Sequence, residues 1–224
     1  LKELMLCRRP NWEILFRLYH DQKLNPMSFL RSEEFLNILT ECCIKDYPYT
    51  PFADAFHTMR SMLLPVLYLM GSEVPKADVY HAICTGYGGL LACLGGHVYK
   101  KKVLLTEHGI YTREREEEII RAKWVQPAFK KQWISFFYML SDIIYTRAFL
   151  VSALFTNAMH AQIQMGCDKG KCRVVENGIN YERLSPIPLK KEDGWVDIGA
   201  IVRLAPIKDI KTMIYAFYEL CTTR

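Results

Sequence analysis

Apolar side chains recur every three or four residues through the first third of the chain, the spacing of helices that bury one face. This pattern predicts helices around Trp12–Tyr19, after Ser32 and across Phe52–Met70. Ser32 precedes two glutamates, a composition typical of a helix N-terminus. The aromatic and methionine residues on these faces indicate a hydrophobic core and not a cofactor site.

From Asp78 onward, short apolar runs alternate with helical patterns. Four of these runs predict strands, at residues 78–83, 103–105, 148–154 and 173–175. Strands that alternate with helices indicate a parallel sheet with right-handed crossovers. The predicted fold class is therefore α/β, with a Rossmann-like parallel sheet flanked by helices.

The helices between these strands differ in character. The first is apolar and is expected to reach about Leu94, where Gly95 and Gly96 turn the chain into the next strand. A charged helix opens at Thr112, and a long amphipathic helix covers residues 129–145. A last helix, over residues 157–165, is expected to end at Gly166, because glycine readily adopts the left-handed conformation that closes a helix.

A change of composition marks a second unit. The segment Tyr181–Asp193 contains Pro186 and Pro188 and a run of charges, as linkers do. A further strand over Val196–Ile201 and a helix over residues 209–220 follow. One strand and one helix cannot bury their own apolar faces, so the sequence is expected to be a fragment. We predict an N-terminal Rossmann-like domain over residues 1–184 with a helical leading segment, a linker over 185–194 and the first βα unit of a second Rossmann-like domain over 195–224.

Composition excludes several classes of protein. Half of the 224 residues are hydrophobic and 24% are charged, the balance of a soluble globular protein with a sizeable core. The net charge of +5 is mild, and nucleic-acid binding would require a denser basic cluster. Cys167 and Cys172 form the one close cysteine pair outside the adjacent Cys42 and Cys43. A zinc site needs about four ligands, so we expect no metal and a reducing, cytoplasmic compartment.

Two stretches carry candidate chemistry. The strand over residues 103–105 leads into Glu107, His108 and Gly109, and Arg113 follows at the start of the charged helix. Open α/β sheets bind their ligands at the carboxyl ends of the strands, although a solvated loop before a surface helix would look the same. The glycine-rich turn that contains Gly86 lies at a predicted helix N-terminus, where backbone N–H groups can receive an anion. Close packing of helix on strand explains these glycines equally well.

Four sequence segments together resemble one family. They are, in chain order, ADVYHAICTGYGG (77–89), TEHGIYTRER (106–115), VVENGIN (174–180) and RLAPIKDIKT (203–212). They are similar to the cytosolic glycosyltransferases of Pel exopolysaccharide synthesis, which belong to the retaining glycosyltransferase family 4. The resemblance covers the chain from about Phe52 onward, and the second segment is the most specific.

The resemblance implies a GT-B architecture, in which two Rossmann-like domains face each other and the second holds a sugar nucleotide. It implies a metal-independent enzyme without a cofactor, which takes UDP-glucose as donor and a polysaccharide as acceptor. It also implies a cytoplasmic location, at the inner face of the cell membrane beside membrane-embedded exopolysaccharide synthesis proteins.

The same resemblance assigns roles to individual residues. His108 matches the family's histidine at the end of an N-domain strand, which reaches the donor sugar. Arg203 and Lys208 match the pair that neutralises the donor diphosphate, a task for which guanidinium and ammonium groups are suited where no divalent metal is present. Asn177 and Gly178, with Glu107, Gly109, Arg113 and Gly86, are candidate cleft residues.

Two features depart from the family pattern. Val202 stands where the family usually has glycine, and the family's paired-glutamate motif has no counterpart in residues 1–224. A second hypothesis therefore stays open, namely a non-catalytic GT-B-like interaction module of a polysaccharide-synthesis complex. A third is a family 4 enzyme that acts on a lipid or small-molecule acceptor.

Overall fold

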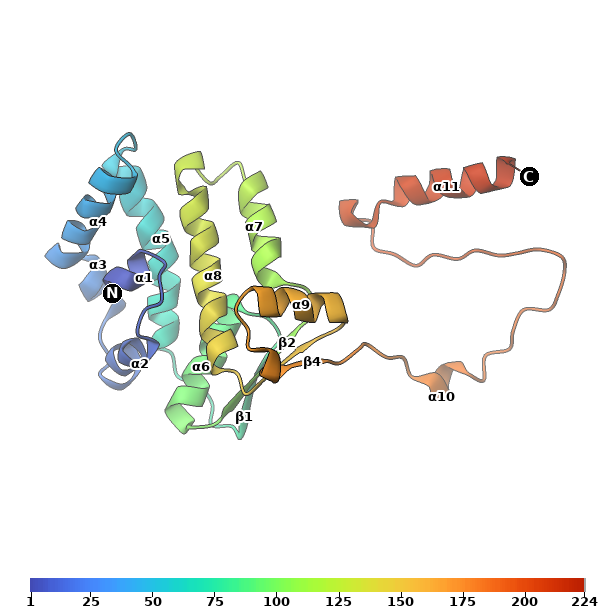
Figure 1. Cartoon of the computed structure of the whole chain (residues 1–224), viewed down its shortest axis with the longest axis horizontal. Coiled ribbons are helices and arrows are strands. Elements are labelled where there is room, and N and C mark those ends of the chain that lie inside the picture. The colour runs from blue at the N-terminus through green and yellow to red at the C-terminus, as the bar shows by residue number, and fades with distance from the viewer. Residues whose placement is uncertain (224) are drawn as a thin grey trace. The chain divides into compact units, whose positions relative to one another are not determined.

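The computed structural model describes residues 1–223 and divides into two compact units. The first unit covers Leu1–Gly178, and the second begins at Ile179. The first unit thus ends at Gly178, whereas the sequence pattern placed the end of the N-terminal domain at residue 184. It contains the sheet and the hydrophobic core (Figure 1).

A four-stranded parallel sheet forms the base of the first unit, with its strands in the order β1-β2-β3-β4. In register, Leu105 lies beside Ala82 on one side and Val151 on the other. The predicted α/β class with a Rossmann-like parallel sheet is confirmed. The strand bounds are β1 Val79–Ala82, β2 Lys102–Glu107, β3 Leu150–Ala153 and β4 Cys172–Val174.

Helices precede and connect these strands. Those before the sheet are α1 (Lys2–Met5), α2 (Trp12–Phe16) with a π-helical turn at Arg17–Asp21, α3 (Pro26–Leu30), α4 (Glu33–Asp46) and α5 (Phe52–Met70). Those between the strands are α6 (Gly86–Tyr99), α7 (Tyr111–Arg121), α8 (Lys130–Arg147) and α9 (Thr156–Gln164). The Ser32 hydroxyl accepts a hydrogen bond from the Phe35 N–H at 3.1 Å, which confirms the predicted start of α4. Across residues 1–223, no helix has the combined length and apolar character needed to cross a bilayer.

The helices of the first unit form two layers over one face of the sheet. Helix α6 contacts β1 and β2, and α9 contacts β3 and β4. The N-terminal helices pack on the outside of this layer through contacts of α5 and α2 with α6. Consecutive parallel strands that all advance in one direction place their right-handed crossovers on the same side, which explains the one-sided cover.

The opposite face of the sheet lies open within the first unit. Alternate residues of β2 are buried, and the side chains between them, Leu104 and Thr106, are only half-buried. A row of polar groups crosses this face from strand to strand. The His81 ring nitrogen Nε2 lies 2.9 Å from Thr106 Oγ1, which lies 2.7 Å from Ser152 Oγ.

The end of helix α6 differs from the one predicted from the sequence. It does not end near Leu94 but continues through Gly95 and Gly96 to Tyr99, and it is closed by Lys100 in the left-handed conformation (φ 54°). These glycines serve packing and not turning. The Tyr80 ring lies directly against Gly95, and that ring is fixed because its hydroxyl donates to the Pro75 carbonyl at 2.7 Å.

The second unit consists of a short helix α10 (Tyr181–Leu184), a 3-10 turn at Pro206–Lys208 and helix α11 (Ile210–Thr222). The predicted helix over 209–220 is confirmed. The strand predicted over Val196–Ile201 is wrong: these residues form no regular structure. A strand needs a neighbour for its backbone N–H and C=O groups, and the described part of this unit offers none.

Gly95→Ala should destabilise the first unit by about 1–3 kcal/mol, because the added methyl group overlaps the fixed Tyr80 ring. Gly88→Ala, in the same helix, is the matched control. Its new Cβ meets only the Cys84 sulfur at 3.3 Å, and alanine favours the helix by up to about 1 kcal/mol. Denaturant unfolding followed by near-UV circular dichroism compares the two. Equal stabilities would show that α6 does not pack on β1 through Gly95.

Candidate functional site

Two βα turns meet at the carboxyl edge of the sheet. The first joins β1 to α6 through Thr85 and Gly86, and the second joins β2 to α7. The Tyr111 ring, at the start of α7, lies over Gly86, where a Cβ atom would come within 2.6 Å of it. Gly86 also has a φ of +69°, which L side chains rarely adopt. Glycine is therefore required here both for the turn and for the contact between the two turns.

Glu107, the last residue of β2, is the buried centre of this edge. Its side chain is 1% exposed. The Tyr145 hydroxyl of α8 donates to Glu107 Oε2 at 2.7 Å, and the Gln162 amide of α9 donates to the same oxygen at 3.0 Å. One carboxyl group therefore holds β2 to two helices that come much later in the chain.

The second oxygen of this carboxyl group, Oε1, is buried without a hydrogen-bond partner among the described residues. Burial raises the pKa of Glu107, and the hydrogen bonds from Tyr145 and Gln162, together with the nearby backbone N–H of Tyr111, oppose that rise only in part. Burial also raises the pKa of the Tyr145 phenol, which the neighbouring carboxyl group raises further. The pair therefore favours its protonated forms.

His108 and Gly109 follow Glu107 at the surface. His108 is exposed and lies immediately after the end of β2. The carboxylate of Glu114 lies directly against Gly109, where a Cβ atom would displace it. The turn thus holds His108 outward, between the buried Glu107 and a carboxylate from the first turn of α7.

A hydroxyl cluster fixes both turns to α8. Ser141 is 2% exposed, and its hydroxyl donates to Thr85 Oγ1 at 2.8 Å. The Ser141 hydroxyl oxygen also lies 3.3 Å from the hydroxyl oxygen of Thr112, in the first turn of α7. Because hydroxyl groups buried in this way are paired with one another, they add specificity to the packing of three helices at one point.

The other predicted site residues are more dispersed. Arg113 points toward α9, where its guanidinium lies 3.5 Å from the Gln164 amide oxygen. Asn177 and Gly178 are exposed after β4, at the same edge of the sheet as His108. Arg203 and Lys208 belong to the second unit, where both are exposed. The first unit thus brings together Gly86, Glu107, His108 and Gly109.

Residue patterns did not reveal the partners of Glu107. Tyr145 and Gln162 lie 38 and 55 positions from it in sequence, so no local spacing connects them. Ser141 did leave a signal, since it is a polar residue among the apolar positions of α8. A polar side chain on a buried helical face implies a buried hydrogen bond, though not the identity of the partner.

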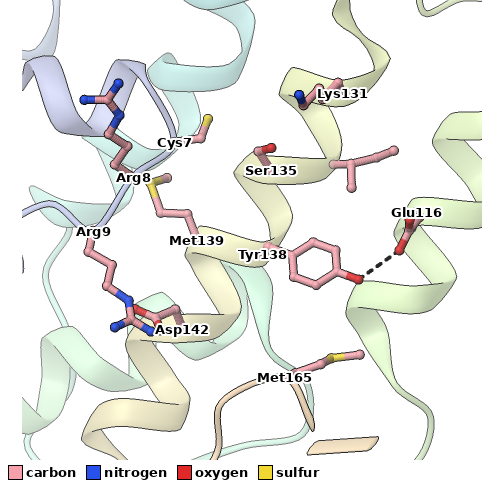
Figure 2. A pocket seen from close by; sticks show the side chains of 11 residues that line it. Cys7, Arg8, Arg9, Glu116, Lys131, Ser135, Tyr138, Met139, Asp142 and Met165 are labelled. Atoms are coloured by element: carbon pink, nitrogen blue, oxygen red, sulfur yellow. Dashed lines mark hydrogen bonds and ion pairs between the residues drawn. The ribbon is translucent and has the colours of Figure 1, made fainter.

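A separate groove lies along the outer side of α8 (Figure 2). Its volume is about 690 Å³. Several of its charged or polar side chains are already paired: Arg9 with Asp142 at 2.8 Å, and the Tyr138 hydroxyl with Glu116 at 2.9 Å. These pairs occupy much of the polar lining of the groove.

Among residues 1–223, no group of three His, Cys, Asp or Glu side chains is arranged to hold a metal ion. A family model described as a domain of unknown function (DUF3492) matches residues 6–170, and this domain occurs in glycosyltransferase-like proteins. The match includes Gly86 and the turn from Glu107 to Gly109, but not Arg203 or Lys208. No curated protein and no solved structure matches the chain.

Glu107→Gln should change how stability depends on pH. A carboxyl group whose pKa is raised by folding stabilises the folded state at low pH and loses that contribution as pH rises from its unfolded value, near 4.5, through the folded value. The glutamine variant cannot ionise. Its unfolding free energy relative to the wild type should therefore increase across this window.

Urea unfolding of both proteins from pH 4 to pH 8 measures this difference. The other titrating groups contribute equally to both proteins and cancel. A difference that stays constant over the whole range would mean that Glu107 titrates like an exposed carboxylate.

Proposed function

The chain belongs to the family described as a domain of unknown function (DUF3492), and on that premise we propose that it forms part of a retaining, metal-independent glycosyltransferase. The proposed enzyme transfers a sugar from a UDP-sugar, UDP-glucose by resemblance, to a growing exopolysaccharide. The resemblance of its four sequence segments to the Pel-type cytosolic enzymes supports the donor and acceptor classes. The carboxyl edge of the sheet is the proposed reaction side of this unit.

One observation carries the proposal most directly. The buried Glu107 carboxyl group fixes the end of β2, and exposed His108 follows it beside the glycine turn at the start of α6. A rigid strand end that presents a titratable ring to solvent is the arrangement that open α/β sheets use for ligands. The buried network fixes the backbone position from which His108 projects, which lowers the entropy lost when its ring meets a reacting group.

The role we propose for His108 follows from the chemistry of glycosyl transfer. Departure of a nucleoside diphosphate leaves positive charge on the sugar and negative charge on the phosphates. The His108 ring would donate a hydrogen bond to the donor sugar and help to orient it as the glycosidic bond breaks. Backbone N–H groups at the start of α6 could receive a phosphate or hydroxyl oxygen, because the first turn of a helix leaves them free.

We propose that Arg203 and Lys208 of the second unit bind the donor diphosphate. Their side chains are exposed, and each carries a charge suited to the diphosphate. The interaction-module hypothesis shares the fold but requires none of this chemistry. Measured turnover of a UDP-sugar therefore separates the two.

His108→Ala in the full-length gene product should lower kcat by about 10²-fold or more, the scale for a positioned histidine that acts on a reacting group. Its melting temperature should stay near that of the wild type, because the exposed ring contributes little packing. Single-turnover transfer from UDP-glucose and thermal unfolding are measured on one preparation. The control is His160→Ala, another exposed histidine, on α9. Unchanged transfer by the His108 variant would remove His108 from the mechanism.

Lys208→Ala should weaken stabilisation of the transition state by about 2–4 kcal/mol, the usual effect of losing one charge-stabilising donor. Arg203→Lys should also reduce kcat/KM, since a bidentate guanidinium becomes a single ammonium group. Lys211→Ala, a few residues further on in α11, serves as the matched control. Wild-type kcat/KM in both variants would contradict the diphosphate role.

A further inference from the structure

Trp124 is an exposed aromatic residue that the proposed reaction does not use. It follows the end of α7 and is 68% exposed. Large apolar side chains on a surface are common singly, but an exposed tryptophan beside a hollow is typical of a binding site. Its ring lies beside two such hollows.

The first hollow has a volume of about 350 Å³ and lies between α5 and the segment before α8. Besides Trp124 and Trp133, polar side chains line it: Asp54, His57, Thr58, Ser61 and Gln126. The Ser61 hydroxyl is used within α5, where it donates to the Thr58 carbonyl at 2.8 Å. Within residues 1–223, the side chains of Asp54, His57 and Gln126 form no hydrogen bond, so they remain free to bind a ligand.

The second hollow, of about 480 Å³, lies on the other side of Trp124 along α7. Three glutamates and one arginine line it: Glu114, Glu117, Glu118 and Arg121. Of these, Glu117 is paired with Arg121 at 3.4 Å, and Glu118 is paired with Arg115. Among the described residues, Asp54 and Glu114 are the carboxylates beside Trp124 that form no ion pair, and unpaired carboxylates repel phosphate groups.

The helix pair α7 and α8 carries this site outward from the carboxyl edge of the sheet (Figure 1). Ser141 of α8 lies at that edge, because it bonds to Thr85 and Thr112. The part of α8 before Ser141 therefore extends about 16 Å beyond the edge, at 1.5 Å per residue. Helix α7 lies antiparallel to it: the Lys130 ammonium donates to the Ile120 carbonyl near the tip, and the Tyr138 hydroxyl donates to Glu116 further along.

Aromatic rings connect Trp124 to the candidate site along this helix pair. The Trp124 and Trp133 ring centroids are 6.1 Å apart, and Trp133 stacks on Phe137 at 6.0 Å. Phe137 meets Tyr111 edge-on at 5.9 Å, and Tyr111 lies over Gly86. The rings form a continuous series from the tip of the helix pair to the turn beside His108.

We propose that Trp124 and the first hollow, between α5 and the segment before α8, form a binding site for a carbohydrate chain. The site is placed to hold the acceptor polysaccharide at a distance from the reacting end. The assignment of the bound sugar as acceptor rests on the proposed function. Sugar rings present C–H groups of positive partial charge, which pack on the negative face of an aromatic ring. Their hydroxyl groups both donate and accept, which suits the carboxylate, imidazole and amide groups around Trp124.

The same residues argue against a nucleotide in this site. A base could stack on Trp124 equally well, but its phosphates would lie near the unpaired carboxylates of Asp54 and Glu114. Uncharged hydroxyl groups avoid that repulsion. The chemistry of the hollow therefore favours a chain of sugars.

Titration of the intrinsic tryptophan fluorescence with cellohexaose and with chitohexaose tests the site. At least one of these oligosaccharides should bind and change the emission of the wild-type chain. Trp124→Ala should weaken its binding by roughly fivefold or more, the effect of losing an aromatic contact at the centre of a site. Trp124→Phe should retain part of the affinity, because it keeps an aromatic face. The matched control is Trp195→Ala, which removes another exposed tryptophan, 80% accessible, from the second unit.

Binding of neither oligosaccharide, or equal binding by the wild type and Trp124→Ala, would overturn the proposal. Equal loss in the Trp195 variant would also overturn it, since the effect would not be specific to this site. The full-length protein supplies a second measurement. There, Trp124→Ala should raise the KM for the oligosaccharide acceptor while hydrolysis of UDP-glucose without acceptor stays unchanged.

The two proposals can fail separately. Oligosaccharide binding that depends on Trp124, in a protein that does not turn over any UDP-sugar, would uphold the carbohydrate site and reject the glycosyltransferase. Turnover of UDP-glucose with no effect of Trp124→Ala on acceptor KM or on oligosaccharide binding would uphold the glycosyltransferase and reject the carbohydrate site.

Discussion

A carboxyl group buried at the end of a central strand organises the first unit. Glu107 cannot be left without partners inside the protein, because an unpaired buried carboxyl group is strongly unfavourable. The hydroxyl of Tyr145 and the amide of Gln162 supply those partners, and so α8 and α9 are held in fixed positions over β2. The packing of the helices over the sheet and the exposure of His108 both depend on this arrangement.

The glycines at the sheet edge also bring neighbouring elements into close contact. Gly86 lets the ring of Tyr111 approach the start of α6, and Gly109 lets Glu114 fold back over the turn. Each position exchanges a side chain for a close contact between two elements. The backbone turns of the edge are therefore closely packed, while His108, Asn177 and the first N–H groups of α6 remain available to a ligand.

How much of this could be predicted from the sequence depends on the range of the interaction. The bounds of α5 and the start of α4 follow from local patterns, namely apolar spacing and the Ser32 cap. The end of α6 did not, because Gly95 and Gly96 are packing positions. Their partners, Tyr80 for Gly95 and Val103 for Gly96, belong to the neighbouring strands β1 and β2. The strand expected over Val196–Ile201 failed for a related reason, since an apolar run forms a strand only beside another strand.

For the candidate site, too, the local sequence predicted some features and long-range contacts determine the others. The local sequence identified Glu107 and His108 as polar residues after an apolar run, but it did not show that one is buried and the other exposed. That difference comes from Tyr145 and Gln162, which only the folded chain brings near. Likewise, the sequence predicted an amphipathic helix over residues 129–145, but only the positions of Trp124 and Tyr111 join its aromatic residues into a series that reaches the surface.

The order of the strands has a consequence for how the protein is made. In the sheet β1-β2-β3-β4, each new strand pairs with the strand synthesised just before it. No strand has to be inserted between two others that are already paired, so the sheet can grow from one edge as the chain leaves the ribosome. The buried carboxyl group of Glu107 gains its two partners only when α8 and then α9 have been added. The last steps of this vectorial assembly are therefore the ones that complete the candidate site.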